Sequence, residues 1–318
     1  MIIVKISMGL GNQMFQYAAA KALSLEKNTM LKLDISTYSG YKLRKYELAD
    51  CFNIQAPVAT QEEIAVCNYC HPVKLVWNKL FPQKKMRILS LPYEEPVLQR
   101  NLLGLYDFFL PPYKRRIYTE PHYHYDDNFY NALDHTYLQG YWMSWRYFDK
   151  YATEIKNEFV VNHSLVAQHD AFVSKMQDQN SVSIHIRRTD YTTPEVIALK
   201  GRTTMEFYKQ AIAHIEKNTD DPVYYMFSDD ITWVKENFPM QHRNVCYIDK
   251  NISTSSIEDF YLMTQCKHNI ITNSTFGWWA AYLNANPGKI IIAPKKWYNN
   301  KVYNYKDVCP PSWVQIAA

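Results

Sequence analysis

The chain has 318 residues, of which 47% are hydrophobic and 21% are charged, and its formal net charge is +4 at pH 7. A chain of this length can form two domains of ordinary size, and two is the number we expect. The small net charge and the lack of a long run of one sign exclude a polyanion-binding arm, so no nucleic-acid partner is expected.

Residues 1–7 are expected to form a buried strand, and they lack the charged, apolar and small-residue parts of a signal peptide. No apolar run reaches the roughly 18 residues that a membrane-spanning helix needs. The cysteines are few and irregularly spaced, which is typical of reduced thiols: Cys51, Cys67, Cys70, Cys246, Cys266 and Cys309. These features predict a cytoplasmic protein.

Two features after residue 65 have alternative interpretations. Cys67 and Cys70 have C-x-x-C spacing, but only His71 is a close further ligand, so we expect no structural metal. Residues 71–87 mix basic and apolar side chains, which suits a helix on a membrane surface. A solvated helix packed on its own domain is the favoured alternative.

The N-terminal half opens with a βαβ pattern. Residues 1–7 predict a strand, 8–11 a turn, 12–27 an Ala-rich helix and 30–35 a second strand. Between residue 51 and about 131 the pattern weakens into Pro- and Tyr-rich stretches, which indicates insertions and loops around a core.

Strand-like and helix-like segments alternate in the C-terminal half. The expected strands are 181–187, 222–228, 244–248, 269–272 and 289–293, and the expected helices are 203–217, 231–237, 255–267 and 274–284. Such alternation predicts a doubly wound α/β domain of parallel strands, and we place the domains at 1–160 and 161–318. In such sheets, ligands bind beyond the carboxyl ends of the strands, where the strand order reverses.

The turn after the first strand contains Gly9 and Gly11, and Asp34 ends the second strand, which partly imitates a dinucleotide fingerprint. Met14 stands where that fingerprint needs a small residue, so a nicotinamide or flavin cofactor is not expected. Asn12 stands at the expected helix start, where it could bind a phosphate or a sugar hydroxyl, or could simply cap the helix.

The strand 181–187 leads into His185, Arg187, Arg188 and Asp190. Arginine forks bind phosphate oxygens in pairs and stay charged at any working pH, so Arg187 and Arg188 suit a pyrophosphate. Alternation places His185 and Arg187 on one face and Arg188 nearer the loop. A structural ion pair with Asp190 is the alternative.

Two other polar segments follow strands. Asp229 and Asp230 could accept hydrogen bonds from a base or a ribose, or could cap the next helix. Residues 273–276 bring hydroxyl and N–H groups to a helix start, which suits an anion. No Asp-x-Asp triplet occurs, so a leaving phosphate would be stabilised by the protein's own cations and dipoles, without a metal.

The segments 9–18, 185–190, 227–230 and 258–284 together resemble the bacterial members of glycosyltransferase family 11, the α-1,2-fucosyltransferases. The resemblance implies an α/β, GT-B-like fold of two Rossmann-like domains that face each other across a cleft. It implies that the second domain mainly holds GDP-fucose and the first holds the acceptor.

The resemblance also implies site residues. The catalytic residues would be His185, Arg187, Arg188 and Asp190, of which Asp190 is the first candidate for a base. GDP-fucose would be bound by Gly11, Asn12, Arg187, Arg188, Asp229, Asp230, Asn273, Ser274, Thr275 and Phe276. The implied reaction transfers L-fucose, with inversion, to the 2-hydroxyl of a terminal galactose, and it needs no metal or other cofactor.

Three alternatives stay open: another GDP-sugar donor, a nucleotide-cofactor oxidoreductase, and a non-catalytic carbohydrate-binding protein. Two arginines at a strand end argue against the last. The acceptor is expected to be a galactose-terminated glycan, and a lipid-linked acceptor would bring the protein to the inner face of the membrane. Residues 40–135 are expected to influence that choice.

Overall fold

The computed structural model describes residues 1–40, 43–64, 117–120, 123–188, 203–298 and 306–317. The chain divides into two compact units: unit 1 contains residues 1–49 and 54–157, and unit 2 contains residues 50–53 and 158–318. The short segment 50–53 therefore belongs to the second unit, although it lies within the first of the two predicted domains, 1–160 and 161–318.

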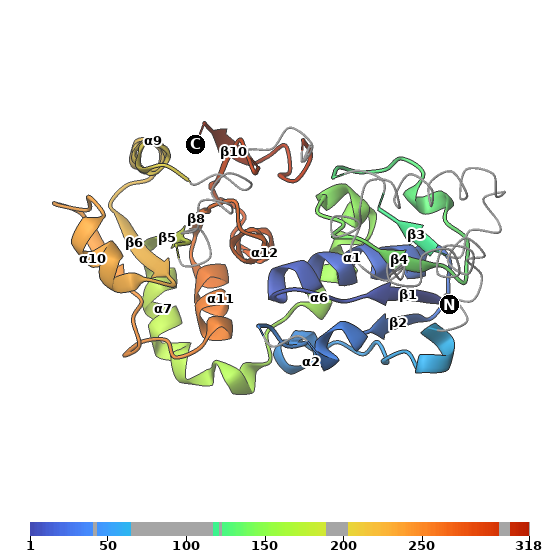
Figure 1. Ribbon diagram of the computed structural model, residues 1–318. Helices are drawn as coiled ribbons and strands as arrows, with labels where there is room; N and C mark the ends of the chain where they lie inside the picture. The colour runs from blue at the N-terminus through green and yellow to red at the C-terminus, as the bar shows by residue number, and fades with distance from the viewer. Residues whose placement is uncertain (41–42, 65–116, 121–122, 189–202, 299–305, 318) are drawn as a thin grey trace, which may run out of the picture. The chain divides into compact units, whose positions relative to one another are not determined.

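Unit 1 is built on a four-stranded sheet in the order β2-β1-β4-β3, and every pair of neighbouring strands is parallel (Figure 1). The strands are β1 (Ile2–Lys5), β2 (Leu31–Asp34), β3 (Ile117–Thr119) and β4 (Tyr137–Gln139). Helix α1 (Leu10–Glu26) connects β1 to β2, as the opening of the sequence predicted. Its alanines, such as Ala18 and Ala19, are fully buried, which lets the helix pack closely on the sheet.

Short helices lie among the described residues of unit 1 and at the start of unit 2. They are the α-helices α2 (Leu48–Cys51) and α6 (Ala152–Glu158) and the 3-10 helices η1 (Ser36–Ser39), η3 (Phe129–Asn131), η4 (Trp145–Tyr147), η5 (Asp149–Tyr151), η6 (His163–Leu165) and η7 (Ala167–His169). The C-x-x-C pair and the segment 71–87 lie outside the described residues.

Unit 2 contains a six-stranded parallel sheet in the order β10-β9-β8-β5-β6-β7. The strands are β5 (Asn180–Ile186), β6 (Pro222–Ser228), β7 (Asn244–Tyr247), β8 (His268–Ile270), β9 (Ile291–Pro294) and β10 (Val314–Ile316). The helices are α7 (Asp170–Asp178), α9 (Met205–Asn218), α10 (Ile231–Asn237), α11 (Ser256–Gln265) and α12 (Thr275–Leu283).

Numbered within unit 2 from β5, the strands follow the order 3-2-1-4-5-6, which is the Rossmann arrangement. The chain moves outward from β5 in one direction through β6 and β7, and it then returns to place β8 on the other side of β5. The strand order therefore reverses between β5 and β8. This pair marks the edge at which a ligand is expected.

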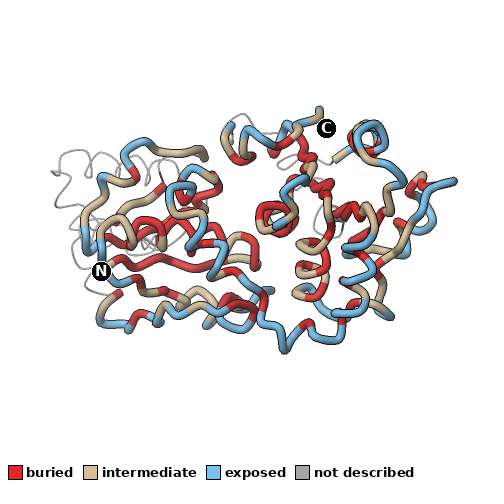
Figure 2. The backbone as a smooth tube through the Cα atoms, turned by 180° about the vertical axis from the view of Figure 1, so that it is seen from behind, coloured by how far each residue is buried: buried red, intermediate tan, exposed pale blue. Residues whose placement is uncertain are grey.

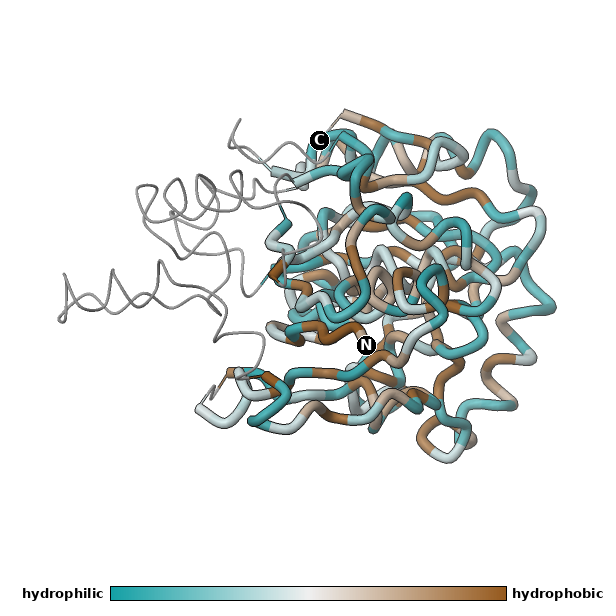
Figure 3. The backbone as a smooth tube through the Cα atoms, turned by 90° about the vertical axis from the view of Figure 1, so that its right-hand side faces the viewer, coloured by the Kyte–Doolittle hydropathy of each residue, from teal (hydrophilic) through white to brown (hydrophobic). Residues whose placement is uncertain are grey.

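The core of unit 2 follows from strand alternation. Val182, Ile184 and Ile186 of β5 point into a hydrophobic cluster beneath α9 and α10. Helix α11 packs against α7 and α12. Strands β5, β8 and β9 are almost wholly buried, whereas β7 and β10 are half-buried or exposed (Figure 2). Figure 3 shows apolar residues mainly in the inner segments and hydrophilic ones in the outer turns.

The segment 50–53 is anchored in unit 2 by one aromatic side chain. The ring of Phe52 lies 5.3 Å from that of Phe159 and 5.9 Å from that of Phe260, centroid to centroid. Its backbone also forms an antiparallel bridge with Val161. Of the helices that the structure describes, none is long and apolar enough to cross a membrane.

Candidate functional site

The register of unit 2 brings two predicted segments to one edge. Val182 pairs with His268, and Ile184 pairs with Ile270. Since parallel strands advance together, the residues after β5 and those after β8 leave the sheet at the same edge. Arg187 and Arg188 therefore emerge beside the start of α12, at the point where the strand order reverses.

The two arginines are tied to the two aspartates at the end of β6. Arg187 Nε lies 3.3 Å from Asp229 Oδ2, and Arg188 Nε lies 3.3 Å from Asp230 Oδ2. The backbone N–H of Arg188 also donates to Asp229 Oδ1 at 2.9 Å. The ion pairs seen at this edge thus join neighbouring strands, whereas Asp190, the alternative partner, lies outside the described residues.

Asp230 also caps α10, as one of the two interpretations predicted. Its Oδ1 accepts a hydrogen bond from the backbone N–H of Trp233 at 3.2 Å. The other oxygen faces Arg188. Both carboxylate oxygens therefore have protein partners, and binding of a base or a ribose by Asp229 or Asp230 stays a prediction.

Arg188 also stacks on an aromatic ring, a contact that no local sequence pattern indicates. Its guanidinium carbon lies 3.6 Å from the centroid of the Trp233 ring. The Nη1 atom is buried and has no hydrogen-bond partner among the described residues. Trp233 could have been suspected only from its place one helical turn after Asp230.

His185 lies beneath the arginines and is 4% exposed. Burial, with a smaller contribution from the positive charge of Arg187, lowers the pKa of His185 to about 4. The imidazole is therefore neutral at pH 7. A Cβ added at Gly277 would lie 2.6 Å from His185 Nδ1, so the glycine allows α12 to approach the strand closely.

The start of α12 contains the other predicted phosphate residues. Asn273 is 8% exposed, and its Nδ2 donates to the carbonyl of Trp297 at 3.0 Å. Ser274 is the N-cap residue but makes no side-chain capping bond. Ser274, Thr275 and Phe276 are half-buried, and the binding of phosphate by these residues stays a prediction.

The glycine turn of unit 1 differs from the prediction. Helix α1 begins at Leu10 with Gly9 as its N-cap, so capping by Asn12 is wrong, and Asn12 lies in the first turn. Gln13 holds the turn instead, since its Nε2 donates to the carbonyls of Met8 at 3.0 Å and Lys45 at 2.8 Å. Gly11 is buried, and Asn12 is half-buried.

Asp34, which suggested a dinucleotide fingerprint, is fully buried. Its carboxylate accepts hydrogen bonds from the Tyr137 hydroxyl at 2.6 Å and from the Ser36 backbone N–H at 2.9 Å. This aspartate therefore stabilises the fold of unit 1 and does not face a ribose.

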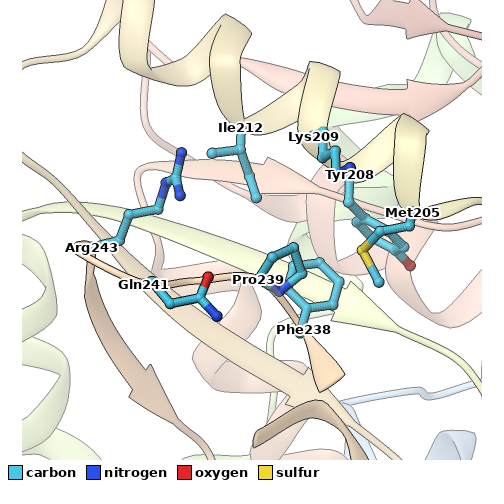
Figure 4. Close-up of a pocket in the computed structure, with 8 residues that line it drawn as sticks. All are labelled: Met205, Tyr208, Lys209, Ile212, Phe238, Pro239, Gln241 and Arg243. Atoms are coloured by element: carbon cyan, nitrogen blue, oxygen red, sulfur yellow. The ribbon is translucent and has the colours of Figure 1, made fainter. Parts of the chain in front are cut away.

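A surface cavity of about 270 Å³ lies between α9 and the segment after α10, and no predicted site residue lines it (Figure 4). Its lining comprises Met205, Tyr208, Lys209, Ile212, Phe238, Pro239, Gln241 and Arg243. Tyr208 lines the cavity and also contacts β5, because its hydroxyl donates a hydrogen bond to the backbone carbonyl of His185 at 3.4 Å. Among the described residues, no group of His, Cys, Asp and Glu could hold a metal ion.

The fold resembles that of the NodZ α-1,6-fucosyltransferase in a crystal soaked with GDP-fucose. The TM-score is 0.52 at 15% identity, over 90% of this chain and 96% of NodZ. At this identity the similarity shows the fold alone. Each unit contains one parallel Rossmann-like sheet, and the fold is of the GT-B class.

The chain belongs to glycosyl transferase family 11, whose model matches residues 1–317. It is 30% identical to an α-1,2-colitosyltransferase from Escherichia coli, over 99% of this chain and 98% of that protein. It is also 30% identical to the galactoside 2-α-L-fucosyltransferase SEC1 from Bos taurus, over 57% of this chain and 51% of that protein.

Proposed function

We propose that the protein transfers L-fucose from GDP-fucose to the 2-hydroxyl of a terminal galactose in a glycan acceptor, with inversion and without a metal ion. The observation that carries the proposal is the arginine pair at the switch point of unit 2, where the buried Nη1 of Arg188 has no hydrogen-bond partner among the described residues. Support for the sugar and the linkage comes from the name of the bovine relative, a galactoside 2-α-L-fucosyltransferase.

The chemistry asks for charge stabilisation at the leaving group. As the bond between the anomeric carbon and the β-phosphate oxygen breaks, negative charge grows on the GDP pyrophosphate. We propose that Arg187 and Arg188 stabilise this charge, and their ion pairs with Asp229 and Asp230 support the proposal because they hold the two guanidinium groups in place. His185 is neutral at working pH, so it shapes the end of β5 and adds no charge.

The second half of the reaction forms the bond to the acceptor. The galactose 2-hydroxyl attacks the opposite face of the anomeric carbon and loses its proton, which requires a base or a strongly dissociative transition state. We propose Asp190 as that base, since it follows the arginines by two residues.

A second candidate is the same reaction with GDP-colitose as donor, which the similarity to the α-1,2-colitosyltransferase favours. Colitose is L-fucose without its 3-hydroxyl group. A donor site that hydrogen-bonds this hydroxyl would reject colitose strongly, because a buried partner would be left unpaired. Competition between the two donors therefore distinguishes the candidates.

The experiment that tests the proposal incubates the purified protein with GDP-fucose and lactose in the presence of EDTA. GDP release and product mass are followed against a control without acceptor, and NMR assigns the linkage. We expect acceptor-dependent GDP release and a fucosyl-lactose with an α-1,2 bond. GDP binding without turnover would direct attention to other acceptors or GDP-colitose, whereas no GDP binding would contradict the proposal.

A further inference from the structure

Arg188 is held on two sides by the first turn of α10. The face of its guanidinium stacks on the Trp233 ring at 3.6 Å, and its Nε lies 3.3 Å from Asp230 Oδ2. The side chain is 17% exposed. A guanidinium has few rotational freedoms left when both its plane and its Nε are held.

The carboxylate of Asp230 contacts both Arg188 and the backbone of Trp233. Asp230 Oδ1 accepts from the Trp233 backbone N–H, while Asp230 Oδ2 accepts from Arg188. The capping hydrogen bond from the Trp233 backbone N–H to Asp230 Oδ1 therefore holds the Asp230 carboxylate close to the residue that carries the ring. Both contacts to Arg188 come from one rigid turn, and its Nη1 remains without a partner among the described residues.

The two contacts affect the charge of Arg188 differently. Asp230 brings a negative charge that offsets the attraction of Arg188 for an anion. The tryptophan ring attracts a cation through its quadrupole and leaves the net positive charge in place. Trp233 therefore orients the arginine without neutralising it, which is what a phosphate-binding group requires.

We propose that Trp233 is a positioning residue that fixes the plane of Arg188, so that the accessible part of the guanidinium meets a phosphate oxygen of the bound nucleoside diphosphate. The inference rests on the proposed function. Because the arginine is ordered before binding, the binding free energy is not reduced by the entropy cost of ordering this side chain, and affinity for the diphosphate rises. Affinity for the nucleoside part of the donor is unaffected.

The competing explanation is that Trp233 only packs against the hydrophobic core of unit 2, which it partly does. Two substitutions separate the explanations. Trp233→Leu keeps an apolar contact with the core but removes the aromatic face, whereas Trp233→Phe keeps a smaller face. Val245→Ala is the matched control, because Val245 packs on the same cluster from β7, the strand on the far side of β6 from Arg188.

The test measures the Kd of GDP by calorimetry, the Kd of guanosine by competition, the kcat/KM for GDP-fucose, and the urea midpoint of each variant. For Trp233→Leu we expect GDP affinity and kcat/KM to fall about tenfold, which corresponds to one lost cation–π and ordering contribution. Guanosine affinity should not change. Trp233→Phe should lose about threefold or less, and Val245→Ala should lower only the urea midpoint.

Each other outcome overturns a stated claim. If wild-type protein binds GDP and Trp233→Leu binds it equally well, the positioning role is wrong and the proposed function stands. If guanosine and GDP weaken together, or if Phe is no better than Leu, Trp233 acts on the fold and not on Arg188. If wild-type protein binds no GDP, the proposed function itself fails. Should Trp233→Leu not fold, Trp233→Met replaces it with the same expectations.

Discussion

The two sheets of this protein reverse their strand order in similar ways but present different chemistry at the reversal. In unit 1 the reversal lies between β1 and β4, and Gln16 joins the two strand ends. Its Oε1 accepts from the Ser7 N–H at 2.9 Å, and its Nε2 donates to the Gly140 carbonyl at 3.1 Å. In unit 2 the corresponding edge carries Arg187 and Arg188.

Gly140 shows how closely the edge of unit 1 is filled. A Cβ at this position would lie 2.7 Å from Glu120 Oε2 and 3.2 Å from the Trp142 ring. The same Glu120 oxygen accepts from the Tyr141 N–H at 2.7 Å. In both units the sheet topology therefore determines where a ligand site can form. The side chains at the strand ends determine whether that place is occupied by protein side chains, as in unit 1, or carries cations that suit an anion, as in unit 2.

The largest expected effect tests the charged edge. Arg188→Ala should reduce GDP affinity and kcat/KM by about a hundredfold or more, because a charge-assisted donor at the leaving phosphate is lost. Calorimetry and a GDP-release assay measure both quantities. Arg243→Ala is the control, since Arg243 forms an ion pair with Glu216 away from the switch point. Near-normal kinetics for Arg188→Ala would show that this edge does not hold the donor.

The next effect tests the filled edge. Gly140→Ala should destabilise the protein by about 2 kcal/mol, because overpacking forces Glu120 and Trp142 to move. Urea unfolding measures the change. Gly40→Ala, in the same unit, has no heavy atom near the added Cβ and should alter stability little. Equal urea midpoints for the two variants would contradict the close packing at Gly140.

A smaller effect concerns pH and the buried imidazole of unit 2. The pKa of His185 is about 4 in the folded protein, below its unfolded value, so the unfolded state binds the proton more readily. Its contribution to stability is complete above the unfolded pKa, near 6.5, and is lost as the pH falls towards 4. Between pH 7 and 5.5 the expected loss is about 1 kcal/mol.

The measurement compares the urea midpoints of wild type and His185→Gln at both pH values. The difference between proteins is needed because burial raises the pKa of Asp259 to about 6, which adds stability as the pH falls over the same range. His185→Gln should show the smaller acid loss. An identical pH dependence would mean that His185 is not buried in its neutral form.

The smallest expected effect is that of metal removal. If Arg187 and Arg188, and not a metal ion, stabilise the charge of the leaving group, EDTA should change turnover by less than about twofold. Activity that disappears with EDTA and returns with Mg²⁺ or Mn²⁺ would contradict the metal-free reaction and would assign the charge stabilisation elsewhere.

Most elements of unit 2 could be predicted because mainly apolar strands alternate with amphipathic helices and are bounded by polar turns. The sequence range 222–228 coincides with β6, and 231–237 coincides with α10. Among the described residues, the strands β3, β4 and β10 were not predicted, and neither was helix α7. Each of these strands has only three residues, which is too short to show an alternation of period two.

The site was predictable where its residues follow a strand directly and not where distant contacts decide. Arg187, Arg188, Asp229 and Asp230 were found from their positions at strand ends. The bond between Asp34 and Tyr137 spans 103 residues, and nothing near Asp34 reveals it. The stack of Arg188 on Trp233 likewise depends on the pairing of β5 with β6, which local patterns do not specify.

The packing of residues 50–53 in unit 2 has a consequence for synthesis on the ribosome. Phe52 emerges long before Phe159 and Phe260, the rings against which it finally packs. Until those two residues have been synthesised, the side chain of Phe52 lacks its packing partners. During this time, contact with a chaperone or with another nascent chain competes with folding. A hybrid enzyme made by joining halves of two relatives near residue 158 would separate these rings, so the donated half must bring its own counterpart of residues 50–53.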